Sequence, residues 1–115
     1  MGKPAYFTEG MRAYRRGDYS AAVESLGALA DRDDLPGKLA RYYCAMAHRA
    51  MGVESLEAGE FSAAAEHLRQ AVALIGNKAE LVEYLRVAVQ LTYEELAEFR
   101  KVEDSGQPES SESLH

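Results

Sequence analysis

The sequence has no tryptophan, three prolines and one cysteine in 115 residues. The single cysteine, Cys44, excludes an internal disulfide, and its apolar neighbours indicate a small buried side chain rather than a reactive thiol. The prolines, Pro4, Pro36 and Pro108, stand where a helix is expected to begin or where structure is expected to have ended. Little therefore interrupts helix formation between residues 4 and 102.

Long apolar runs and a basic surplus are also missing. No stretch approaches the roughly 20 apolar residues of a membrane span, and the opening Met-Gly-Lys-Pro lacks the apolar core of a signal peptide. We therefore expect a cytoplasmic protein without membrane insertion. The net charge is −6, and the acidic surplus lies in residues 59–115, which carry eleven acidic and five basic side chains. Without a basic face, the chain is not expected to bind nucleic acid.

Patterns of catalytic and metal-ligating residues are absent as well. His48, His67 and His115 are scattered, and none has a cysteine, an aspartate or a second histidine at the spacing of metal ligands. The G-x-S-x-G motif does not occur, and Ser20 and Ser62 stand at expected helix starts. We expect a protein that is not an enzyme, with no cofactor and no metal. His48 is expected to be a partly buried packing residue.

The residues that are abundant favour helix. Apolar side chains recur at helical spacing, and glycines or acidic residues mark the helix ends. The pattern predicts five helices, over about 4–16, 19–30, 36–58 and 61–75, and from after Asn77 to Val102. Residues 103–115 hold no large apolar side chain except Leu114. They are predicted to form a disordered acidic, serine-rich tail or linker after a helical domain at 1–102.

One ten-residue segment occurs twice. "GDYSAAVESL" begins at Gly17 and "GEFSAAAEHL" begins at Gly59, so the period is 42 residues. At this period Gly10 also aligns with Gly52, and Leu26 aligns with Leu68. Each copy reads as a helix, a turn of glycine, acid and aromatic residue, and a second helix. The sequence therefore predicts a duplicated antiparallel helical hairpin, with the mid-helix glycines at close helix contacts.

The segment "YFTEGMRAYRRGDYSAAVESLGAL" resembles a tetratricopeptide repeat (TPR). The residues of the first copy that match the repeat pattern are Tyr6, Gly10, Gly17, Asp18, Tyr19, Ala22 and Leu26. Those of the second copy are Gly52, Gly59, Glu60, Phe61, Ala64, Leu68 and Ala71. The resemblance covers roughly residues 3–76. It implies an all-α, right-handed stack of two antiparallel hairpins with a fifth, capping helix.

The copies depart from the family pattern in length and in several residues. The family period is about 34 residues, and the excess fits an N-terminal extension of the third helix near Pro36. Glu9 and Ala13 stand where the family usually has a leucine and an aromatic residue. His48 replaces the first aromatic residue of copy two.

The resemblance also implies a non-catalytic role, in which a concave groove on the first helix of each hairpin binds a peptide or partner helix. The residues expected to bind the partner are Phe7, Met11, Tyr14, Arg15, Arg41, Met46, Arg49, Val53 and Leu56. Packing inside the fold is the alternative for Phe7, Met11 and Tyr14. Phe7 and Met11 also occupy positions where the family's basic clamp for acidic C-terminal peptides would have lysine and asparagine, so that ligand is not expected.

The alternative function is self-association. The main stripe of the fifth helix consists of Leu81, Leu85, Ala88, Thr92, Leu96 and Phe99. A second apolar side of the same helix is formed by Tyr84, Val87 and Leu91. Two preceding hairpins do not obviously cover that much apolar surface, so the partner of this helix would be a second copy or another part of a scaffold.

Overall fold

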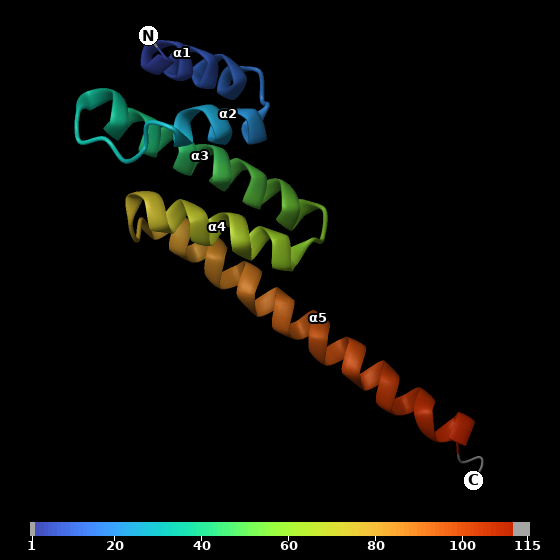
Figure 1. Ribbon diagram of the computed structural model, residues 1–115. Helices are drawn as coiled ribbons and strands as arrows, with labels where there is room; N and C mark the ends of the chain where they lie inside the picture. Colours follow the sequence, from blue (N-terminus) through green and yellow to red (C-terminus); the bar gives the residue numbers. More distant parts are fainter. Residues whose placement is uncertain (1, 112–115) are drawn as a thin grey trace.

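The protein is all-helical in the computed structural model, which describes residues 2–111 and the side chains of residues 6–101. The helices are α1 (Gly2–Arg15), α2 (Tyr19–Gly27), α3 (Leu35–Glu57), α4 (Phe61–Ile75) and α5 (Ala79–Ser111). Each helix packs against the next one in the chain, so that the helices form a single stack in sequence order (Figure 1). The expected all-α class is confirmed.

The α1–α2 and α3–α4 connections are the same turn. Gly17 and Gly59 adopt φ values of 83° and 79°, a left-handed conformation that a residue without a Cβ atom enters at little cost. In the first turn the N–H of Asp18 donates to the carbonyl of Ala13 at 2.9 Å. The bond 42 residues later joins Glu60 to Ser55 at 2.8 Å. The sequence duplication is therefore also a duplication of backbone geometry.

A glycine and a leucine meet inside each hairpin. A Cβ atom added to Gly10 would lie 2.5 Å from Cγ of Leu26, and one added to Gly52 would lie 2.8 Å from Cγ of Leu68. Both leucines are completely buried. The predicted close helix contacts at the two glycines are thus present, and they occupy equivalent positions in the two copies.

Buried side chains form two clusters along the stack. The first joins α1, α2 and the first half of α3, and includes Met11, Leu26, Leu29 and Cys44. The second joins α3, α4 and α5, and is centred on Leu68 and Leu81 with small alanines around them. Because α3 contributes to both clusters, it connects the two hairpins.

The segment between the hairpins differs from the prediction. Helix α2 ends at Gly27 rather than near residue 30, and Leu29 turns back into the first cluster. Asp34 then caps α3, accepting a hydrogen bond from the N–H of Gly37 at 3.1 Å. Gly37 is buried against the backbone of Arg32, where a Cβ atom would overlap the Arg32 carbonyl. This packing brings the start of α3 under the α2–α3 loop.

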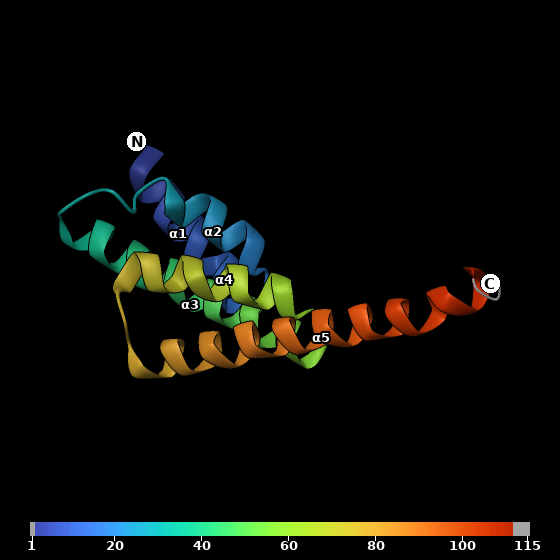
Figure 2. The same cartoon turned by 90° about the horizontal axis from the view of Figure 1, so that it is seen from below.

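Helix α5 extends far beyond the other helices. Residues 93–101 are all exposed, and Figure 2 shows this part of α5 leaving the stack. The molecule measures 71 × 25 × 21 Å as a result. The sequence predicts order to end after Val102, whereas α5 continues through Ser111; residues 112–115 lie outside the described part. None of the described helices is long and apolar enough to cross a membrane.

Candidate binding groove

One side of α3 carries a row of side chains along its whole length. Leu35, Leu39, Tyr42, Met46, Arg49 and Val53 are spaced alternately by four and three residues, which places them on one face of a helix. The first three are the most exposed, at 66%, 37% and 47% of their full accessible surface. An apolar strip at the N-terminal end of α3 is therefore open to solvent.

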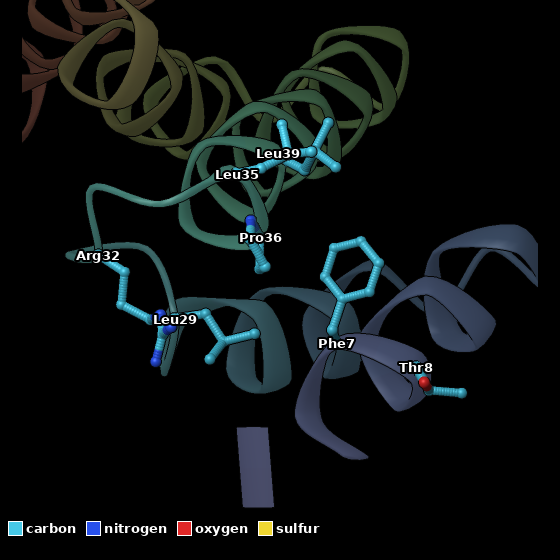
Figure 3. Close-up of a pocket in the computed structure, with 7 residues that line it drawn as sticks. All are labelled: Phe7, Thr8, Leu29, Arg32, Leu35, Pro36 and Leu39. Atoms are coloured by element: carbon cyan, nitrogen blue, oxygen red, sulfur yellow. The ribbon is translucent and has the colours of Figure 1, made fainter. Parts of the chain in front are cut away.

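A pocket lies beside this strip, between α1, the end of α2 and the start of α3. It has a volume of about 520 Å³ and is open on one side. Its lining is mainly apolar and consists of Phe7, Thr8, Leu29, Arg32, Leu35, Pro36 and Leu39. In Figure 3 the Phe7 ring points from α1 toward the start of α3, where Pro36 and Leu39 lie. We call the pocket and the exposed strip of α3 the groove.

Polar contacts hold the wall of the groove in place. The Arg41 guanidinium donates to the carbonyl oxygens of Ala30 and Arg32, at 2.6 and 3.0 Å, and thereby ties the α2–α3 loop to α3. Arg32 forms an ion pair with Asp34. The hydrogen bond from Arg32 lowers the pKa of the Asp34 carboxyl to about 2, and the bond from the Gly37 N–H adds to the effect. The loop therefore has a defined shape where it borders the pocket.

Aromatic rings fill the middle of the α1–α3 contact. The ring of Tyr14 meets the ring of Tyr43 edge-on at 5.2 Å between centroids, and the ring of Tyr19 at 5.7 Å. Tyr43 meets Tyr42 in the same manner at 5.1 Å. Tyr14 is therefore a half-buried packing residue at one border of the groove, and it links α1, α2 and α3.

At the other end of the row, α3 contacts α5. Arg49 forms an ion pair with Glu80, and its guanidinium carbon lies 5.4 Å from the centre of the Tyr84 ring. The Nε atom of Arg49 is buried without a hydrogen-bond partner among the described residues. Tyr84, expected on a separate self-association surface, is thus brought together with the expected groove residue Arg49.

The other predicted binding residues have different environments. Met11 is 8% exposed and belongs to the first buried cluster, so its side chain packs inside the fold instead of facing a partner. The Arg41 guanidinium already bonds the loop carbonyls described above. Arg15 is exposed, and Val53 is half-buried. Met46 and Leu56 are half-buried against the second cluster.

The residues predicted for self-association are less exposed than those that follow them. Tyr84, Val87 and Leu91 are half-buried. The exposed apolar side chains lie further along α5, where Tyr93, Leu96 and Phe99 are 69%, 55% and 62% exposed. Leu96 and Phe99 continue the main apolar stripe of α5 beyond the point where α4 begins, so nothing in the described structure covers them.

Two titratable groups outside the groove have perturbed environments. His48 is half-buried, as expected, and its Nδ1 lies 3.4 Å from Nδ1 of His67. Burial lowers the pKa of His48, and the neighbouring His67 lowers it further. Burial raises the pKa of the Cys44 thiol to about 11, which fits its expected role as a small core residue. Sequence reasoning missed the histidine pair because its members lie on different helices.

Comparison with known proteins gives no match: no family model fits the chain, and neither a curated protein nor a solved structure matches it.

Proposed function

We propose that this chain is a non-catalytic protein-interaction module of the tetratricopeptide-repeat type, and that its groove binds a helical segment of a partner. The observation that carries the proposal is the apolar pocket of about 520 Å³ beside the exposed residues Leu35 and Leu39. Apolar pockets that open along a helix are typical sites for anchor side chains of a partner helix.

The form of the groove supports a helical ligand. Leu35, Leu39 and Tyr42 present a strip about two turns long, and the pocket beside it is lined by Phe7 and Pro36. A helix that places two apolar side chains at i and i+3 or i+4 would fill the pocket with one and cover the strip with the other. Arg15 is exposed and lies two helical turns from the pocket residue Thr8, on the same side of α1, from where it would add a charge-assisted bond to an acidic side chain of the partner.

The duplicated turns and the paired Gly–Leu contacts support the repeat assignment. They give both hairpins the same internal geometry, as the repeat architecture requires. The excess of the 42-residue period over the family length then accounts for the α2–α3 loop and the first turns of α3, which form the pocket. The departure from the family pattern would thus build the binding site.

Selection from a displayed library of helix-forming peptides tests the proposal. The protein used to select peptides carries Leu96→Glu. This substitution removes an exposed apolar side chain of α5, the helix expected to self-associate, and leaves the groove intact. We expect selected peptides to share two apolar residues at i and i+3 or i+4. Binding should weaken at least tenfold, equivalent to about 1.4 kcal/mol, when Leu39→Glu is added.

Ala63→Glu is the matched control, because Ala63 is an exposed helical residue on α4 away from the pocket. It introduces the same charge and should leave the affinity unchanged. Peptides that bind equally well to the Leu39→Glu protein, or that lose affinity with Ala63→Glu, would contradict the proposed site.

A further inference from the structure

The projecting part of α5 exposes large apolar side chains of the kind that helices usually bury against another element. Tyr93, Leu96 and Phe99 are each more than half exposed, and they follow one another at three-residue intervals. The radius of gyration is 19.6 Å, whereas a compact chain of this length has about 13 Å. Helices in proteins gain most of their stability from packing an apolar side. In this segment, residues 93–99, only Tyr93 borders another helix, beside Ser62 and Ala65 of α4, and the residues after it have no such packing within the described chain.

We infer that residues 93–99 of one copy occupy the groove of a second copy, so that the molecules associate head to tail. The inference rests on the proposed function, because it uses the same groove and names its occupant. The segment has the features of the ligand proposed for the groove. It is an already formed helix with large apolar side chains at i and i+3, namely Leu96 and Phe99. The groove offers an apolar pocket beside Leu35 and Leu39.

The charges of the two surfaces are complementary. The segment "YEELAEF" contains Glu94, Glu95 and Glu98 and no basic residue, with Arg100 and Lys101 following it. The α1 side of the groove carries exposed Arg15, whereas Arg12 lies toward α2, beside Ala21 and Ser25. Arg15 lies two helical turns from Thr8, which lines the pocket, so both are on the same side of α1. An acidic helix in the groove would therefore have a basic side chain, that of Arg15, beside it.

The same charges disfavour pairing of two α5 segments with each other. Such a contact would place the three glutamates of one segment near the three of the other around a small apolar centre. Like charges brought together at an interface cost free energy and select against that partner. The groove, with Arg15 on its α1 side, is the better complement.

The position of the two surfaces determines the kind of assembly. The pocket lies where α3 begins. In Figure 1 the start of α3 and the projecting part of α5 are on opposite sides of the molecule. One molecule therefore cannot fill its own groove with its own α5. Each association leaves one groove and one α5 segment available, which produces chains, or rings if the rotation closes. The few side chains involved make a small interface, with a Kd of about 10–1,000 μM.

Sedimentation velocity on the full chain tests this inference. The wild-type protein should associate as its concentration rises toward about 1 mM, and added salt should weaken the association because opposite charges meet. Leu96→Glu on the helix side and Leu39→Glu on the groove side should each weaken association at least tenfold. Both residues are exposed, so both variants are expected to keep the circular dichroism spectrum of the wild type.

Mixing the two variants is the decisive step. The Leu96→Glu protein keeps an intact groove and the Leu39→Glu protein keeps an intact α5 segment, so an equimolar mixture should form a one-to-one dimer and nothing larger. A mixture that stays monomeric, or a Leu39→Glu protein that still self-associates through α5, would overturn the inference. A wild type that remains monomeric at about 1 mM would overturn it as well.

The peptide selection separates this result from the proposed function. If the groove of the Leu96→Glu protein binds library peptides while the copies do not associate, the occupant is wrong and the groove function stands. If neither peptides nor α5 depend on Leu39, the groove itself is rejected.

Discussion

At the residue scale, the two hairpins depend on a small residue facing a large one. Gly10 faces Leu26 and Gly52 faces Leu68, with no room for a Cβ atom in either place. A glycine inside a helix normally lowers helix stability by about 1 kcal/mol relative to alanine. At Gly10 and Gly52 the missing side chain allows the two helices to approach closely. Replacing either glycine by alanine should therefore lower the stability of the protein, whereas the same replacement elsewhere in a helix usually raises it.

We predict that Gly→Ala substitutions at Gly10 and at Gly27 change the free energy of unfolding in opposite directions. Gly10→Ala should destabilise the protein by about 1–3 kcal/mol, because the added carbon overlaps buried Leu26. Gly27→Ala is the control, since nothing lies within 4 Å of a Cβ atom there, and it should be neutral or stabilising by up to about 1 kcal/mol. Urea denaturation measures both. Equal effects would show that α1 and α2 are not in close contact at Gly10.

The histidine pair makes a pH-dependent contribution to stability. The pKa of His48 is lower in the folded protein than its ordinary value of 6.5, so the unfolded chain binds the proton more readily. The stability that depends on neutral His48 is therefore present above about pH 6.5 and is lost as the pH falls below it. His48→Gln should flatten thermal stability between pH 7 and pH 5.

His67→Gln should reduce this pH dependence without abolishing it, because burial is the larger cause of the shift and His67 the smaller one. Asp34 does not interfere with the measurement. Its pKa is about 2, so the stability linked to its carboxylate is lost only at much lower pH. A His48→Gln profile parallel to that of the wild type would exclude His48 as the titrating group.

At the element scale, the parts predicted well from sequence were those decided by neighbours in the chain. The turns at Gly17 and Gly59 follow from a local rule, because few other residues adopt positive φ at low cost. Helix α4 has the predicted bounds, since glycines stand at both of its ends. The close contacts at Gly10 and Gly52 followed from the repeat, which compares the chain with itself.

The groove could not be predicted in the same way. Leu39 and Tyr42 have the spacing of buried residues, and only the position of α3 relative to α1 decides that they are exposed. The Arg41 bonds to the loop and the Arg49–Glu80 ion pair join residues 9 to 31 positions apart. For Met11 the sequence left partner binding and internal packing open, and the arrangement of α1 against its neighbours places its side chain in the core. These features depend on tertiary packing, which the residue pattern does not encode locally.

The far end of α5 gives a prediction of its own. Because residues 93–101 are exposed, α5 gains no packing energy after it leaves the stack. Ending the chain after Val102 should therefore change the melting temperature by less than about 2 °C, well below the 4–8 °C that 1 kcal/mol produces in a domain of this size. Differential scanning calorimetry measures the change. A larger loss would show that residues 103–115 contact the helical stack.

At the scale of the whole molecule, stability should vary along the stack. Helices α3 and α4 are packed on both sides, whereas α1 and the end of α5 are packed on one side or none. Hydrogen exchange should be slowest for the amides of α3 and α4 and fastest for those after Tyr93. Protection factors read by mass spectrometry test this order. Slow exchange beyond Tyr93 in dilute solution would mean that the segment is covered in the monomer.

The sequential packing also has a consequence for how the chain folds. Among the described helices, contacts join only neighbours in the chain and the pairs α1–α3 and α3–α5, so no contact connects α1 or α2 to α5. The mean sequence separation of contacting residues is therefore small, and the loop entropy required to reach the native topology is low. Such a chain can form one hairpin and extend from it in either direction, with folding times of microseconds to milliseconds.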